Sequence, residues 1–236
     1  MQYAGMIKQS LVDYPGEIVT VLFSRGCNLR CPFCHNPDLL IKPRMTDPPV
    51  DIVEVLEFMS KRKGFLDGVV FSGGEPTLSQ ELIADIRSVK ELGLLVKLDT
   101  NGTNTPMLEL LLREGLLDYV AMDIKSPVEY KKYREACEKL SLENFFNIRS
   151  SILLLQAAGI DVEFRTTVVP SLHSPEDIVA IAKFIEGARL YTLQQFNPRV
   201  TLEPGYGQVV PYTKKEMQQI ADLCAPHVKE VRVVNL

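Results

Sequence analysis

Three cysteines lie close together in the segment CNLRCPFCHN, which covers residues 27–36. Cys27, Cys31 and Cys34 follow the spacing C-x3-C-x2-C, and clustered thiolates of this kind bind zinc, copper(I) or iron–sulfur clusters. A structural zinc ion takes four ligands. His35 is a candidate for the fourth, but it directly follows Cys34, so its ring would have to fold back onto the metal of its neighbour. The spacing therefore favours an iron–sulfur cluster in which one iron has no cysteine ligand.

Polar residues accompany the ends of six predicted strands. The cysteines follow the first, and the other ends carry SGGEPT (72–77), LDTNGT (98–103), MDIK (122–125), Arg165 with two threonines, and QQFNP (194–198). The carboxyl ends of parallel strands meet at one edge of a sheet, where α/β proteins build their active sites. We therefore expect these six clusters to converge on one site.

Both signs of charge occur in these clusters. The charged residues are Glu75, Asp99, Asp123, Lys125 and Arg165. Any one of them could simply form an internal ion pair or cap a helix. As a set they suit a zwitterionic ligand with a carboxylate, an amine and hydroxyls. Gly73 and Gly74 permit a positive φ or a close approach of the backbone to a ligand.

Short apolar segments alternate with segments of helical period along most of the chain. The predicted strands cover 18–23, 68–71, 94–98, 118–124, 162–169, 190–196 and 228–234. The predicted helices cover 51–62, the segment from Leu82 to Val89, a leucine-rich segment ending near Gly115, a segment interrupted near Ser141, the segment from Ile178 to Ile185, and 213–224. These elements must position the polar clusters.

Six strand–helix units in strict alternation predict a parallel sheet with right-handed crossovers. A closed barrel of eight units takes about 250 residues. The sequence therefore predicts an α/β fold that is an incomplete TIM-type barrel, in preference to a doubly wound sheet. We expect a single domain over 1–236, with a core at about 17–200 and a C-terminal helix and strand extension at about 201–236. The open side of such a barrel suits a bulky substrate.

The 236 residues are 46% hydrophobic and carry a net charge of −4. This balance argues against nucleic-acid binding, which favours a clustered basic face. We find no signal peptide and no apolar stretch that could span a membrane, so we expect a cytoplasmic protein in a reducing compartment. Cys137 and Cys224 are distant from the cysteine cluster in sequence and are interpreted as small buried hydrophobes. His173 is expected beside a helix that Ser174 caps, and neither it nor His227 receives a role.

The motifs together resemble a known family. The cysteine triplet, with Phe33 before its third cysteine, and the following GGEP resemble the radical S-adenosylmethionine superfamily. The segments CHN, LDTNG and DIK are similar to the proteins that activate glycyl-radical enzymes. The opening SLVDYPGEIVTVLF resembles the activating proteins of anaerobic ribonucleoside-triphosphate reductases. The resemblance extends from about Ser10 to Pro204.

The resemblance implies two cofactors. Cys27, Cys31 and Cys34 would hold three irons of a 4Fe–4S cluster, and the amino and carboxylate groups of S-adenosylmethionine would chelate the fourth iron. It also implies residues around that cofactor: Phe33 near the adenine, His35 beside the cluster, Gly73, Gly74 and Glu75 at the methionine amine, Asp99, Thr100, Asp123 and Lys125 near the methionine and ribose, and Arg165 at the carboxylate. Gln195 and Asn197 are looser assignments.

The implied activity is reductive cleavage of S-adenosylmethionine to a 5′-deoxyadenosyl radical, which installs a glycyl radical on a partner enzyme such as anaerobic ribonucleotide reductase. No further cysteine motif follows residue 34, so an external electron donor such as flavodoxin or ferredoxin is expected. One alternative is a radical enzyme acting on a small molecule, similar to deazaguanine synthases. Another is a non-catalytic iron–sulfur or zinc protein, against which GGEP and the polar strand ends argue. The segment 197–207 is either a docking loop for the partner or a lid.

Overall fold

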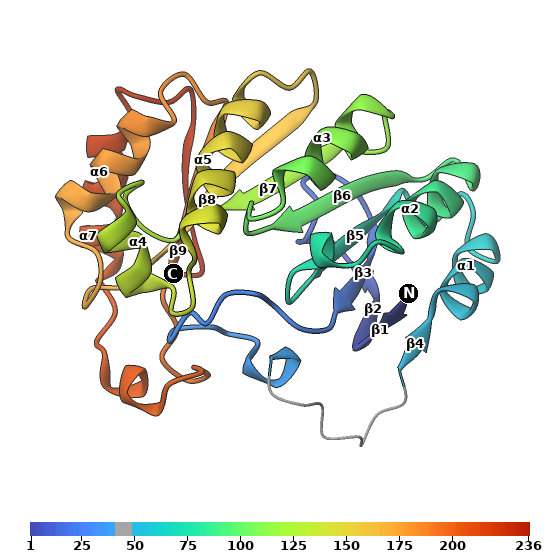
Figure 1. Cartoon of the computed structure of the whole chain (residues 1–236), viewed down its shortest axis with the longest axis horizontal. Coiled ribbons are helices and arrows are strands. Elements are labelled where there is room, and N and C mark those ends of the chain that lie inside the picture. Colours follow the sequence, from blue (N-terminus) through green and yellow to red (C-terminus); the bar gives the residue numbers. More distant parts are fainter. Residues whose placement is uncertain (41–48) are drawn as a thin grey trace.

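A curved eight-stranded sheet forms the centre of the computed structural model, which describes residues 1–40 and 49–236 (Figure 1). Its strand order is β10-β9-β8-β7-β6-β5-β3-β2. The strands are β2 (Gly5–Ser10), β3 (Val19–Ser24), β5 (Gly68–Gly73), β6 (Leu95–Thr100), β7 (Tyr119–Asp123), β8 (Asp161–Val168), β9 (Leu190–Gln195) and β10 (Val231–Val234). All neighbours pair in parallel except β2 and β3, which are antiparallel. A separate antiparallel pair joins β1 (Gln2–Tyr3) to β4 (Val50–Asp51).

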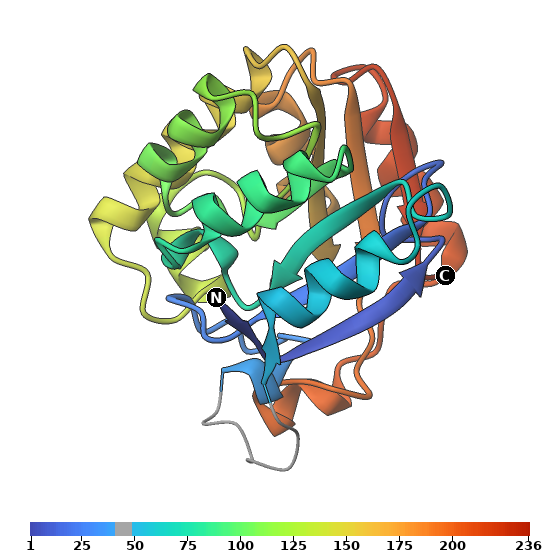
Figure 2. The ribbon, with the colours of Figure 1, turned by 90° about the vertical axis from the view of Figure 1, so that its right-hand side faces the viewer.

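The helices lie around the outside of the sheet (Figures 1 and 2). They are α1 (Ile52–Ser60), α2 (Leu82–Glu91), α3 (Thr105–Arg113), α4 (Tyr130–Ala136), α5 (Leu142–Gln156), α6 (Pro175–Phe184) and α7 (Lys214–Cys224), with short 3-10 turns η1 (Pro37–Leu39), η2 (Pro76–Leu78) and η3 (Pro204–Gln208). Side-chain caps fix where several of them begin. Ser174 and Thr213 each form a capping box, and Asp51, Asn104 and Ser141 accept from a backbone N–H of the first turn.

The two faces of the sheet carry different kinds of side chains. The outer face packs against the helices in the main hydrophobic core, which includes Val96 and Leu98 of β6. Because side chains alternate along a strand, Lys97 and Asp99 point to the inner face. A small apolar cluster occupies this inner face, where the ring of Tyr14 packs on Tyr119 with centroids 5.3 Å apart. The sheet therefore encloses a partly polar interior below the strand ends.

The incomplete barrel predicted from the sequence is confirmed. Six parallel strands, β3 and β5 to β9, alternate with helices as expected, and among the described residues the sheet ends at β10 and β2 without closing. The predicted strand over 228–234 is shorter, and it extends the sheet by pairing with β9. The division into a core and an extension stays a prediction. No helix in residues 1–40 and 49–236 is long and apolar enough to cross a membrane.

The sequence did not predict β2, the antiparallel edge strand. Its residues GMIKQS are mostly exposed, and Ser10 is the one that is buried. An edge strand with few buried side chains lacks the apolar pattern that identifies central strands. The following segment 11–16 turns back under the sheet, where the carbonyl of Asp13 accepts a 2.6 Å hydrogen bond from the Lys97 ammonium.

Candidate functional site

A cavity opens at the carboxyl ends of the parallel strands, where the cysteine loop crosses them. The loop between β3 and η1 contributes Cys27, Leu29, Cys31, Phe33, Cys34, His35 and Asn36. The strand ends contribute Ser72, Gly73, Gly74, Asp99, Thr100, Asn101, Asp123, Lys125, Arg165, Thr167 and Gln194. The residues assigned from the resemblance lie together around this cavity, except Glu75, Gln195 and Asn197, which do not line it. Their roles toward a cofactor stay a prediction.

Gly73 and Gly74 hold the cysteine loop against the end of β5. Gly73 has a φ of +110°, a conformation that L side chains rarely adopt. A Cβ on Gly74 would lie 1.8 Å from the carbonyl oxygen of Gly26, one residue before Cys27. The same oxygen accepts a 2.8 Å hydrogen bond from the Glu75 N–H. The close approach that the glycine pair permits is thus to the cysteine loop itself.

Two further contacts fix the other end of this loop. Arg30 and Glu138 exchange backbone hydrogen bonds of 3.0 and 2.9 Å, which attach the loop to the segment after α4. The N–H of Glu203 donates to the carbonyl of Pro32 at 2.9 Å. Three sequence-distant segments, near 74, 138 and 203, therefore determine where the thiols lie.

The thiols are buried but have hydrogen-bonding neighbours. Burial raises the pKa of Cys27 to about 11 and also raises that of Cys34. These thiols are therefore protonated until a metal displaces the proton. The side-chain amide of Asn101 donates to Cys27 Sγ at 3.5 Å, a contact of the kind that orients metal ligands. Cys137 is buried as predicted, but it is close to the cluster in space, because its Sγ lies 3.3 Å from Cys31 Sγ.

The arrangement of the cysteines suits a cluster better than a single ion. In the described part of the chain, no three His, Cys, Asp or Glu side chains gather closely enough to hold one metal ion. Zinc needs all its sulfur ligands within about 2.3 Å of one point. A cluster instead takes one thiolate on each of several irons, so its ligands stand apart around a space. Cys27, Cys31 and Cys34 line such a space, which fits a cluster with three cysteine ligands.

Glu75 serves as an internal tether. Its side chain is 1% exposed, and burial raises its pKa. One carboxylate oxygen accepts from the N–H and hydroxyl of Thr77 and from the Thr100 hydroxyl, at 3.1, 2.6 and 2.8 Å. The other oxygen accepts from the Asn101 N–H at 2.6 Å. Glu75 thereby ties the end of β5 to the end of β6. The contact to a methionine amine implied by the resemblance stays a prediction.

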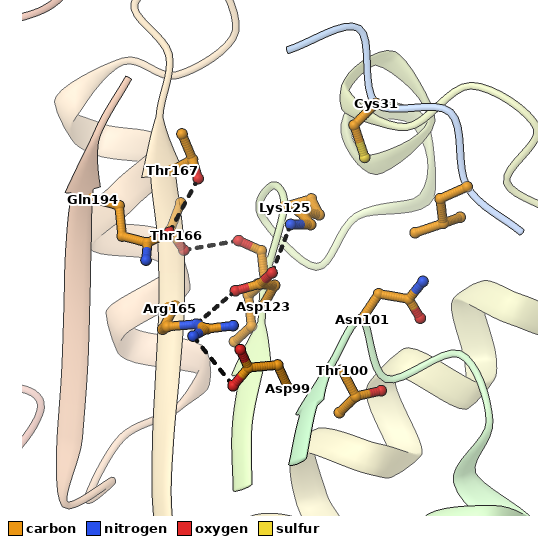
Figure 3. Close-up of polar contacts among 12 residues, drawn as sticks. Cys31, Asp99, Thr100, Asn101, Asp123, Lys125, Arg165, Thr166, Thr167 and Gln194 are labelled. Atoms are coloured by element: carbon orange, nitrogen blue, oxygen red, sulfur yellow. Dashed lines mark hydrogen bonds and ion pairs between the residues drawn. The ribbon is translucent and has the colours of Figure 1, made fainter. Parts of the chain in front are cut away.

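An ion network occupies the middle of the strand ends. Figure 3 shows Arg165 between two carboxylates: its Nε lies 2.9 Å from Asp123 Oδ1 and its Nη1 lies 3.4 Å from Asp99 Oδ1. Lys125 Nζ lies 2.9 Å from Asp123 Oδ2. Burial alone would raise the pKa of Asp123, but Arg165 and Lys125 hold it well below its usual range. The network is charged and rigid before any ligand binds.

Asp99 connects this network to Ser72 of β5 and to Lys97. Asp99 Oδ2 accepts from the Ser72 hydroxyl at 2.9 Å. Asp99 Oδ1 lies 3.0 Å from the Lys97 ammonium, but among the described residues no donor is directed at it well enough to form a hydrogen bond. This oxygen is buried between the Lys97 and Arg165 cations, so its negative charge is balanced within the protein.

His173 is a positioning residue that the sequence did not reveal. It is fully buried, its Nδ1 accepts from the Val169 N–H at 3.0 Å, and its Nε2 lies 2.9 Å from the Lys125 carbonyl. Only the neutral tautomer with a proton on Nε2 satisfies both contacts. Burial lowers its pKa accordingly. The predicted capping by Ser174 is confirmed, but the link to Lys125 spans 48 residues and has no local signal.

His35 separates the cysteine cavity from a second one. Its ring stacks on Phe196 with centroids 6.0 Å apart. The first cavity has a volume of about 210 Å³ and the second about 570 Å³. Gln195 and Asn197 line the second cavity and not the first, so they do not contact the space beside the cysteines.

Known proteins are similar to this chain in sequence. The family model of the radical SAM superfamily matches residues 21–185. The Methanocaldococcus jannaschii protein named "Putative glycyl-radical enzyme activating enzyme MJ1227" is 33% identical over 98% of this chain and 96% of its own length. The "Pyruvate formate-lyase-activating enzyme" of Clostridium pasteurianum is 34% identical over 81% of this chain and 79% of its own length.

A solved structure supports the same fold. SuiB from Streptococcus suis, determined with bound S-adenosylmethionine, superimposes with a TM-score of 0.69 at 15% identity. The likeness covers 92% of this chain and 49% of SuiB, so this chain spans about half of that protein. The family model and the sequence relatives show the family, and the fold and the three-cysteine cavity at the strand ends agree with it. The chain therefore belongs to the radical S-adenosylmethionine superfamily.

Proposed function

We propose that this radical S-adenosylmethionine enzyme installs a glycyl radical on a partner enzyme. The observation that carries the proposal is the cavity that three cysteines line together with the charged side chains of Asp99, Asp123, Lys125 and Arg165. The names of its sequence relatives, which include activators of glycyl-radical enzymes and of pyruvate formate-lyase, support it.

The residues present fit the two cofactors of the superfamily. Cys27, Cys31 and Cys34 would hold three irons of a 4Fe–4S cluster, and the fourth iron would remain for S-adenosylmethionine. When bound, the two groups supply a 5′-deoxyadenosyl radical through one-electron reduction, and this radical takes a hydrogen atom from a substrate carbon. Phe33, which is 3% exposed and lines the cavity, offers an apolar surface for the adenine.

The chain's own contribution is to orient the cofactor and to exclude competing hydrogen donors. Lys125 carries a cation whose ammonium has donors free beyond its ion pair with Asp123, which suits a ligand carboxylate. Asp99 lines the cavity with its charge balanced by Lys97 and Arg165. Thr100 donates to Glu75, which ties the ends of β5 and β6 together. Arg165 donates to Asp123, which ties the ends of β7 and β8 together. Because these groups are already positioned, little reorganisation accompanies binding.

The proposed substrate is a glycine-containing loop of a large partner, with anaerobic ribonucleotide reductase as the first candidate. The opening SLVDYPG supports this choice. The second cavity, lined by Gln195, Asn197 and Arg199 beside His35, offers backbone-binding polar groups next to the cysteine cavity. An external donor such as flavodoxin or ferredoxin would supply the electron.

The test begins with anaerobic reconstitution of the full chain with iron and sulfide. The reduced protein should cleave S-adenosylmethionine to 5′-deoxyadenosine and methionine. Mixed with a candidate reductase or pyruvate formate-lyase, it should produce a glycyl doublet in electron paramagnetic resonance. Cleavage without a doublet on either partner, together with turnover of a pterin-type small molecule to a deazapurine, would favour the small-molecule alternative. A well-reduced protein that leaves S-adenosylmethionine intact would refute both.

A further inference from the structure

A fourth cysteine lies against one of the candidate cluster ligands. Cys137 Sγ is 3.3 Å from Cys31 Sγ, although 106 residues separate the two in sequence. All five cysteines are among the described residues, and each is a free thiol. Of these, Cys31 and Cys137 form the sulfur–sulfur contact. The cluster itself needs no fourth thiol, so this contact has no role in the function proposed above.

The backbone holds the two thiols together. Cys137 directly follows α4 as its C-cap, and its N–H donates to the Tyr133 carbonyl at 2.9 Å. Directly after it, Glu138 exchanges two backbone hydrogen bonds with Arg30, the residue before Cys31. The sulfur–sulfur contact therefore lies beside a two-bond bridge between the segments and does not depend on one side-chain rotamer.

The two thiols differ in their access to solutes. Cys31 is 9% exposed and lines the cavity at the strand ends. Cys137 is 0% exposed and does not line that cavity. A small solute that enters the cavity meets Cys31, whereas Cys137 is in contact with Cys31 from behind. This arrangement gives one thiol that reacts with an oxidant and a second that can react only with the first.

We propose that Cys31 and Cys137 form a site of reversible thiol oxidation in the cluster-free protein, with hydrogen peroxide as the oxidant. Peroxide first converts the Cys31 thiol to a sulfenic acid and leaves as one water. Cys137 Sγ then attacks the Cys31 sulfur, the S–S bond forms, the S–O bond breaks, and the hydroxide leaves as water with the proton of the Cys137 thiol. Two thiols lose two electrons in total, and one peroxide is reduced to two waters.

The geometry needs only a small change. A disulfide has an S–S distance of about 2.05 Å, so the two sulfurs must approach by about 1.3 Å, which small rotations of both side chains can supply. The product and the cluster exclude each other, because Cys31 cannot bind iron while it is in a disulfide. The disulfide also prevents Cys31 from being oxidised further to sulfinic acid, which thiol reductants do not reverse.

The test uses the full chain, freed of iron by a chelator and dithiothreitol under anaerobic conditions, separated from both reagents and then treated with two equivalents of hydrogen peroxide, the amount that oxidation of one thiol to sulfinic acid consumes. After alkylation and digestion, mass spectrometry without reduction should find the Cys31–Cys137 cross-linked peptide as the main disulfide. Dithiothreitol should then restore iron binding to the level of the untreated protein. A main disulfide among Cys27, Cys31 and Cys34, or sulfinic acid at Cys31 beside a reduced Cys137, would overturn the proposal.

A substitution of Cys137 tests whether its thiol reacts with the oxidised Cys31 or takes no part in the reaction. In Cys137→Ser, the same treatment should produce sulfinic acid at Cys31, and dithiothreitol should recover less than half of the iron binding. Cys224→Ser is the matched control, because Cys224 is also fully buried but lies on α7 and should give the recovery of the wild type. Equal recovery in both variants would refute the role of Cys137. The peptide map of the wild type decides the question should Cys137→Ser not fold.

Discussion

Replacing Gly74 by alanine should disrupt the cysteine loop from a distance. The new Cβ would lie 1.8 Å from the Gly26 carbonyl oxygen, so that carbonyl must retreat by at least about 1.2 Å to reach even a tight contact. The shift breaks the 2.8 Å hydrogen bond from the Glu75 N–H and strains the 2.9 Å bond from the Gly26 N–H to Leu39.

One lost and one weakened hydrogen bond, together about 1–2 kcal/mol, and an overpacking cost of about 1–3 kcal/mol give a loss of about 2–5 kcal/mol in the free energy of unfolding. For a chain of this size, that loss lowers Tm by roughly 4–20 °C. Because Cys27 follows Gly26 directly, the folded fraction should also bind less iron and sulfide after reconstitution.

The assay compares Gly74→Ala with Gly159→Ala by urea unfolding and by iron and sulfide analysis. Gly159 has no atom within 4 Å of its Cβ position, so its substitution should leave both measurements unchanged. A Gly74→Ala protein with wild-type Tm and a full complement of iron would refute the argument that this glycine is required by the Gly26 carbonyl.

Three other predictions concern the groups around the cavity. Arg165→Met leaves Asp99 and Asp123 without their shared cation and should lower the free energy of unfolding in urea by about 3–5 kcal/mol. Adding Asp123→Asn should restore part of this loss in the double variant. Losses that simply add in the double variant would contradict the coupling. Because burial lowers the folded-state pKa of His173, the unfolded chain binds a proton first as the pH falls below about 6.5. From pH 7 to pH 5 the wild type should therefore lose more stability than His173→Gln, by at most about 1.4 kcal/mol per pH unit. Parallel pH profiles of the two proteins would show that His173 is not the titrating group. Asn101→Ala removes the amide donor to Cys27 Sγ and should make the reduction potential of the reconstituted cluster more negative. Asn104→Ala, at the cap of α3, is the control. A potential equal to that of the control would mean that this contact does not tune the cluster.

The sequence by itself determined the parallel strands and the edge at which the site lies. Central strands such as β3 and β7 are buried on both faces, so their continuous apolar segments identify them. The cysteine spacing and the strand-end motifs are local, and parallel strands necessarily bring their carboxyl ends to one edge. The cavity residues from Cys27 to Arg165 followed from these two facts.

Only the tertiary structure decided which of these residues line the cavity and which face the rest of the protein. Glu75 points inward to Thr100 and Asn101, and Gly74 faces Gly26, because the cysteine loop folds over the end of β5. Cys31 contacts Cys137, which lies 106 residues away in the sequence, and the carbonyl of Lys125 contacts His173, which lies 48 residues away. A periodic pattern reports which face of an element is buried, but it carries no information about which distant side chain packs there. That choice depends on the curvature of the sheet and on how the segments near 74, 138 and 203 hold the cysteine loop against it.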